Sequence, residues 1–378
     1  MKNGVVFLFL FLPLCASAVA FFPPAVTPPR STASPIRDMN NREIPFAPPA
    51  QRVVIFPPIL SDYATIDQGV SHVVGTSRPN ATPSPDGLTW EVFPEESTLP
   101  VTGRTVDPSD PEIVIRMKPD AVFVWSHVLG SLNNLGFPAL FEVRLVQGNQ
   151  GRQLEMWRLM GRVAGRNERA EMLLAQYLDK LKSLRALLPP KSSHPLRVAI
   201  LNASKDGWWI ASGRNYYLNM NLEWANARNA ADNVLFPMDR GDILERLLTL
   251  DPDIILLNCG GDHGVPQDIY QVPQYRSIRA VRERRVYLMP AYMDASMVVK
   301  DHLLLLWMAE IFYPGQMARL LRQEYVKTYQ SIYGYALKES QIDRVIFLKD
   351  NLGSAGYIRF ANRGERGFDA SGHSSRGE

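Results

Sequence analysis

The chain has 378 residues, of which 46% are hydrophobic and 21% charged. This composition is typical of a globular protein and excludes a disordered chain or a polytopic membrane protein, and the length allows two or three domains with a sizeable core. Lys and Arg number 41 against 38 Asp and Glu, and the formal net charge of +3 gives no support to nucleic-acid binding.

Residues 1–20 have the features of a secretory signal peptide: a basic start, an apolar run and small-x-small cleavage sites. The apolar run at 5–14 is too short to span a bilayer, so an uncleaved anchor is the weaker alternative. Lipidation at Cys15 is disfavoured because the two residues before it, Pro and Leu, are not small. We therefore expect the mature protein to be exported.

Residues 21–50 hold eight of the 29 prolines and predict an extended, mobile leader. Order is expected to begin with a buried strand at 52–56, followed by a second strand at 73–76. The segment 79–107 is rich in Pro, Thr, Ser and Gly and predicts a loop. An N-terminal α/β lobe is assigned to residues 51–149.

One pattern occurs twice in the chain. Residues 111–124 predict a short amphipathic helix that Pro119 ends and a buried strand that follows at once. Residues 244–257 align with them without a gap, with Glu, five mostly apolar residues, a charged residue, Pro-Asp and a strand. An apolar strand at 196–201 precedes the second copy. We predict an α/β protein of two similar lobes, each with a parallel sheet flanked by helices.

A helical linker is expected at 150–189, between the two lobes. Within it, residues 167–188 have apolar positions at helical spacing, with Asn167 as N-cap and a Pro pair after the end. At 1.5 Å per residue this helix would be roughly 33 Å long, a stiff strut. The C-terminal lobe is assigned to 190–347, with helices at its end, and residues 348–378 are expected to be a flexible tail.

Three further segments add to the pattern, because their order and spacing along the chain are specific when taken together. They are 159–166, 278–287 and 325–342, and the last contains Tyr-Gly-Tyr-Ala-Leu. Together with the first strand and the paired Glu and Pro-Asp units, they resemble the substrate-binding proteins of bacterial ABC importers for ferric siderophores, haem and cobalamin. The resemblance covers about residues 51–347. It implies a monomer in the periplasm that binds a small-molecule metal chelate between two lobes. Its partner would be a permease dimer with ATPase subunits.

The resemblance has one departure. Residues 224–231 occupy the place where such proteins commonly have a Gly-Gly-Asn turn.

Ligands of open parallel sheets bind beyond the carboxyl ends of the strands. Aromatic side chains there offer flat apolar area, and arginine offers a planar donor fork for carboxylate, catecholate or phosphate oxygens. This chemistry suits a bulky anionic or aromatic chelate, and the resemblance implies an iron chelate such as a ferric siderophore. Cobalamin or haem is the alternative, and the paired tryptophans could instead pack beneath a loop. The candidates are Arg78, Trp125, Trp208, Trp209, Arg214, Tyr216, Tyr217 and Tyr292.

Direct binding of a bare transition metal has only weak candidates, Asp262 and His263. The six histidines include no HxH or HxxxH pair, and dedicated metal sites need clustered ligands. The chain also contains no G-x-S-x-G elbow, no GxxxxGK[ST] loop and no GxGxxG after the first strand. We expect neither a catalytic residue nor a resident cofactor, and an enzyme acting in the cleft is a distant alternative.

Glu112 and Glu245 occupy the same position in the two repeated units. The resemblance implies that acidic residues at these positions meet arginine pockets on the two permease subunits. Two similar lobes with equivalent carboxylates would suit a two-fold partner. The alternative is that each glutamate merely favours the N-terminus of its own helix.

Overall fold

The computed structural model describes residues 35–77, 87–102, 111–144, 150–204, 207–214, 218–235, 243–258, 264–291 and 297–362. The predicted signal peptide at 1–20, with Cys15, lies outside these residues, as do 363–378 at the end of the predicted tail. In the described part of the chain, no helix is both long enough and apolar enough to cross a bilayer.

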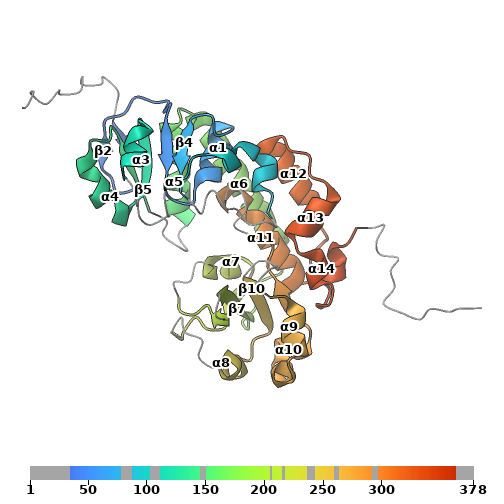
Figure 1. Cartoon of the computed structure of the whole chain (residues 1–378). Coiled ribbons are helices and arrows are strands. Elements are labelled where there is room, and N and C mark those ends of the chain that lie inside the picture. Colours follow the sequence, from blue (N-terminus) through green and yellow to red (C-terminus); the bar gives the residue numbers. More distant parts are fainter. Residues whose placement is uncertain are drawn as a thin grey trace, which may run out of the picture. The chain divides into compact units, whose positions relative to one another are not determined.

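The N-terminal half contains a parallel sheet of four strands in the order β4-β3-β5-β6. Figure 1 labels β4 and β5 of this sheet. Alternate residues face two different cores, with Val53 and Ile55 on one face of β3 and Val54 on the other. Burial on both faces explains why these strands are continuous apolar runs. The elements are β3 (Val53–Ile55), α1 (Leu60–Asp67), β4 (Val73–Thr76), α2 (Thr89–Val92), η1 (Pro94–Thr98), α3 (Pro111–Arg116), β5 (Ala121–Trp125), α4 (Ser126–Leu132), η2 (Asn133–Leu135) and β6 (Leu140–Val143).

The C-terminal half contains a second sheet in the order β11-β10-β7-β8, with β9 paired to the start of β7. Its strands are parallel except β8, which forms an antiparallel hairpin with β7. The mixed α/β fold predicted from the sequence is thus confirmed. The elements are β7 (Leu196–Ser204), β8 (Gly207–Ile210), α7 (Asn219–Trp224), β9 (Ala227–Asn229), α8 (Ile243–Leu250), β10 (Ile254–Asn258), α9 (Pro266–Gln271), η4 (Pro273–Ser277), α10 (Arg279–Arg282) and β11 (Val286–Leu288).

The predicted strut is present as α6 (Asn167–Leu187), which follows α5 (Gln150–Val163). It packs against α5 and against α11 (Met297–Phe312), and a stripe of its side chains is buried. Asn167 is the first residue of the helix rather than its N-cap, which is Arg166. The buried stripe consists of Ala170, Leu173, Leu174, Tyr177, Leu181 and Leu184.

The expectation of a mobile leader up to residue 50 does not hold for its second half. Residues 36–50 form a short hairpin of β1 (Ile36–Arg37) and β2 (Glu43–Ile44), and Met39, Phe46 and Ala50 are buried in the main core. Burial of these three apolar side chains anchors the proline-rich segment, because it removes apolar surface from water.

The expectation of a flexible tail from residue 348 is also corrected. The chain continues through α12 (Leu321–Tyr333), α13 (Glu339–Val345), α14 (Leu348–Asn351) and η5 (Tyr357–Phe360). Tyr357 is fully buried and accepts a hydrogen bond from Trp307 Nε1 at 2.9 Å.

Asn351 binds the outer edge of β11. Its Oδ1 accepts from the Leu288 N–H at 2.8 Å, and its Nδ2 donates to the Leu288 carbonyl at 2.9 Å. The folded C-terminal half therefore extends at least to residue 362.

Candidate functional site

At the carboxyl end of the N-terminal sheet, Trp125 is the last residue of β5 and is half-buried. Ser126 and His127 follow it at the start of α4, and both are exposed. Trp125 packs against the cores on both sides of the sheet. Of the ligand residues predicted in this half, Trp125 therefore lies at the carboxyl end of a parallel strand.

A buried carboxylate lies beside this tryptophan. Glu142, near the end of β6, has a side chain only 3% exposed. Ser126 Oγ donates to its Oε1 at 2.5 Å, and Arg144 Nε lies 3.5 Å from the same oxygen. Arg42 Nε lies 3.8 Å from the other oxygen, so the carboxylate is compensated from two sides.

Arg144 is a further candidate residue, which the sequence alone did not indicate. It is exposed and directly follows β6, and its Nε also lies 3.4 Å from Ser126 Oγ. The apolar run Leu140–Val143, interrupted by Glu142, was the available signal for a fourth strand and hence for a candidate at its end.

In the C-terminal half, Trp208 and Trp209 lie on the short strand β8, which the sequence did not predict. Trp208 pairs with Ala203 of β7, and Trp209 pairs with Asn202. Because successive strand residues point to opposite faces, Trp208 packs against the smaller C-terminal core and Trp209 against the main core. Both remain half-buried.

Two amides lie at the same end of this sheet. Asn258, the last residue of β10, donates from Nδ2 to Asn202 Oδ1 at 2.8 Å. Trp209, Asn202 and Asn258 therefore lie side by side across three adjacent strands. This row offers an aromatic face next to amide donors and acceptors.

Arg214 is exposed and donates from Nη2 to Asn233 Oδ1 at 3.1 Å. Its turn is held by Asn219, whose Nδ2 donates to the carbonyls of Gly213 and Arg214 at 2.9 and 3.1 Å. Asn229 in turn donates to Asn219 Oδ1 at 3.0 Å. The segment that departs from the family's Gly-Gly-Asn turn thus contributes a buried asparagine that orders the arginine's loop.

The remaining predicted residues lie outside the described residues: Arg78, Tyr216, Tyr217, Tyr292, Asp262 and His263. Among the residues that are described, no group of three or more His, Cys, Asp and Glu side chains could hold a metal ion. The two glutamates proposed for docking, Glu112 on α3 and Glu245 on α8, are both exposed in the first turn of their helices.

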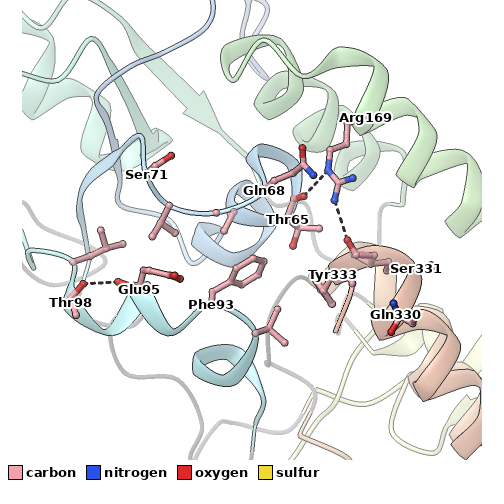
Figure 2. Close-up of a pocket in the computed structure, with 17 residues that line it drawn as sticks. Thr65, Gln68, Ser71, Phe93, Glu95, Thr98, Arg169, Gln330, Ser331 and Tyr333 are labelled. Carbon is pink, nitrogen blue, oxygen red and sulfur yellow. Dashed lines mark hydrogen bonds between the residues drawn. The ribbon is translucent and has the colours of Figure 1, made fainter. Parts of the chain in front are cut away.

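A cavity of about 840 Å³ lies elsewhere, where the C-terminal ends of α1 and α12 meet η1 (Figure 2). Arg169 joins the two helix ends, because its Nε donates to the Thr65 carbonyl at 3.1 Å and its Nη2 to the Ile332 carbonyl at 3.0 Å. Burial lowers the pKa of Arg169, and the nearby Arg166 adds to the effect. We interpret Arg169 as a joint between helices, not as part of the sheet-end site.

Comparison with known proteins identifies the kind of protein that has this architecture. A family model described as periplasmic binding protein matches residues 89–293. No curated protein matches the chain.

Solved structures share the fold at low identity. A periplasmic solute-binding protein from Veillonella parvula is 22% identical, with a TM-score of 0.69 over 84% of this chain and 98% of its own. The molybdate periplasmic binding protein of a Haemophilus influenzae ABC transporter is 20% identical, with a TM-score of 0.67 over 81% and 99%. A periplasmic haem-binding protein from Pseudomonas aeruginosa is 20% identical, with a TM-score of 0.55 over 71% and 94%.

Proposed function

This chain belongs to the periplasmic binding protein family, and we propose that it captures an iron chelate, such as a ferric siderophore, for delivery to the permease of an ABC importer. Binding would be stoichiometric and saturable, without turnover. The signal peptide predicted at residues 1–20 would direct export to the periplasm. Fractionation of cells that produce the full chain tests this, with loss of the protein from the periplasm on deletion of residues 2–20 as the expected result.

The chemistry at the carboxyl ends of the sheets supports a chelate as ligand. Trp125 lies at one sheet end, and Trp209 lies beside Asn202 and Asn258 at the other. The exposed guanidinium group of Arg144 follows at the first of these ends, and the exposed guanidinium group of Arg214 lies beyond β8, next to Asn233. A small oxyanion needs donors but no flat apolar surface, whereas a bulky anionic chelate uses both.

Tryptophan fluorescence tests this proposal. The mature protein is titrated with a catecholate and a hydroxamate ferric siderophore, and separately with haem, cobalamin and molybdate. We expect saturable quenching at one equivalent by a ferric siderophore and a charge-transfer band that co-purifies with the complex. A Soret band after addition of haem, together with tighter binding of haem than of any ferric siderophore, would identify haem as the ligand in place of the iron chelate.

Arg214 provides the residue-level test. Arg214→Ala should weaken binding of the ferric siderophore that quenches best by about 1.5–3 kcal/mol, or roughly 10- to 150-fold, because a charge-assisted hydrogen bond is lost. Arg228→Ala, at an exposed arginine on β9, is the matched control and should bind as the unmodified protein does. Equal affinity of the Arg214→Ala protein would exclude this arginine from the site. Arg78, Tyr216, Tyr217 and Tyr292 are further proposed contacts.

For delivery, we propose that Glu112 and Glu245 contact basic residues on the two permease subunits. Exchange of both for Arg should leave folding and chelate affinity unchanged and abolish uptake, because like charges at a desolvated contact cost several kcal/mol. If the glutamates act only on their helix termini, the exchange would reduce stability by about 0.3–1 kcal/mol and leave uptake normal. Uptake at normal protein level by the doubly exchanged protein would therefore exclude docking.

A further inference from the structure

The helices of the two repeated units have the same pattern of exposed and buried side chains as well as a similar sequence. Position by position, α3 from Pro111 to Arg116 and α8 from Leu244 to Thr249 alternate identically between half-buried, exposed and buried side chains. The buried position is Val114 in one and Leu247 in the other, each in the core of its own half. Each helix is therefore seated with the same face outward.

The outward face carries an aliphatic side chain in both copies. Ile115 is 45% exposed and Leu248 is 44% exposed. Each lies three residues after the glutamate of its unit, and residues three apart are neighbours on a helix surface. A single exposed aliphatic residue is common on protein surfaces. Here, however, the pair of carboxylate and aliphatic side chain recurs at aligned positions of both repeated units.

We propose that Ile115 and Leu248 are the apolar halves of two equivalent docking patches, each completed by its glutamate. This inference rests on the proposed function and extends its docking step. The occupant is the membrane-embedded permease dimer, in which each subunit would offer a basic side chain next to an apolar surface. Charge complementarity selects the basic group, and the repetition of the patch selects a partner with two copies of one surface.

The aliphatic contacts explain how the complex gains affinity. An exposed ion pair between two surfaces contributes little, because water and salt screen it. An adjoining apolar contact excludes water from the pair and strengthens it, as at the centres of protein interfaces. Docking should therefore resist moderate salt more than a contact made by glutamates alone.

The experiment measures binding of the purified mature protein to the cognate permease–ATPase complex reconstituted in phospholipid nanodiscs. Ile115→Gln and Leu248→Gln keep helix-forming side chains but remove the apolar contact. Each should weaken binding about tenfold, and the double variant should weaken it more than either. Met172→Gln, at a residue 44% exposed on α6, is the matched control and should bind as the unmodified protein does.

Further variants separate the possible failures. Ile115→Leu combined with Leu248→Ile should restore binding, and circular dichroism should be the same for all variants. If Ile115→Gln and Leu248→Gln leave binding unchanged while Glu112→Gln and Glu245→Gln abolish it, the role of the aliphatic side chains is overturned and the docking step stays intact. Unchanged binding of all these variants would overturn both. Fluorescence titration with the ferric siderophore reports separately on capture, so its failure would concern the ligand and not this surface.

Discussion

Asp120 and Asp253 perform the same structural task in the two halves of the chain. The Asp120 carboxylate accepts from the backbone N–H of Arg52 at 3.0 Å, and that of Asp253 accepts from the backbone N–H of Arg197 at 2.8 Å. In return, each aspartate N–H donates to the carbonyl of the same arginine, at 2.9 and 2.8 Å. The Pro-Asp of each repeated unit thus ties its strand to the start of the first strand of its sheet.

Loss of either aspartate should destabilise the protein. Asp120→Ala removes the acceptor for the backbone N–H groups of both Gln51 and Arg52 and should lower the free energy of unfolding by about 1.5–3 kcal/mol. Asp253→Ala should cost a similar amount. Urea denaturation measures both, with Asp179→Ala, at an exposed aspartate on α6, as control. Equal stability of all three variants would mean that these hydrogen bonds contribute nothing.

The ion cluster of α6, α11 and α12 predicts a pH dependence. Burial alone would raise the pKa of Glu324, but hydrogen bonds from His302 and Lys180 outweigh it and hold the pKa at about 2. A carboxyl group with a lowered folded-state pKa stabilises the fold above its unfolded value of about 4.5, and this contribution disappears as the pH falls towards 2.

The test compares the unmodified protein with the Glu324→Gln variant. The difference in their free energies of unfolding should be largest at neutral pH and should shrink between pH 4.5 and 2. Denaturant titrations at pH 7, 4.5 and 2.5 measure it, with Glu171→Gln at an exposed glutamate on α6 as control. A difference that stays constant with pH would contradict the lowered pKa.

Arg359 should be essential for stability although it lies in the predicted tail. Its Nε lies 3.2 Å from Glu310 Oε2, and its guanidinium donates to the carbonyls of Glu310, Pro314 and Met317. Burial raises the pKa of Glu310, against hydrogen bonds from the N–H groups of Leu320 and Leu321 and the charge of Arg359.

Arg359→Met would leave a buried carboxylate without its counter-charge and should cost about 3–5 kcal/mol. Combination with Glu310→Gln should cost less than the sum of the two single changes, because the residues interact directly. Thermal and urea denaturation measure both. Stability within 0.5 kcal/mol of the unmodified protein, as expected on an ordinary surface, would show that this segment is not part of the core.

Gly264 should control the position of Trp208. It has a φ of +134°, and a Cβ atom there would lie 2.6 Å from Trp208 Cζ2. Gly264→Ala should therefore displace the indole ring and destabilise the fold by roughly 1–3 kcal/mol. A shifted emission maximum with weaker quenching by the ferric siderophore is expected. Gly130→Ala, where a Cβ meets nothing within 4 Å, is the control.

The sequence was most informative where burial is two-sided. The strands at 73–76 and 254–257 were predicted almost to the residue, because parallel strands are continuous apolar runs bounded by clear breaks. The short strand β8 was not predicted, because Gly207–Ile210 has no alternation that distinguishes it from an aromatic loop. Its hairpin depends on register with β7, which is a tertiary property.

The site was predictable only in part for a similar reason. Trp125 could be located because it ends an evident strand, whereas Arg144 ends a strand that contains a glutamate. The burial of Glu142 is tolerable only because Ser126, Arg42 and Arg144 converge on it from elsewhere in the chain. Such compensation is invisible to periodicity, as are the isolated aromatic anchors Tyr357 and Phe360 in the last segment.

The binding of Asn351 to Leu288 has a consequence for how this protein behaves in a crowded compartment. β11 is the outermost strand of its sheet, and a bare outer strand is a template for another chain. The Asn351 amide takes the hydrogen bonds that an incoming strand would make at Leu288, while Tyr270 and Ser354 occupy the polar groups of Val286. The final segment therefore covers this edge against strand-to-strand association between copies, in addition to what it contributes to the core.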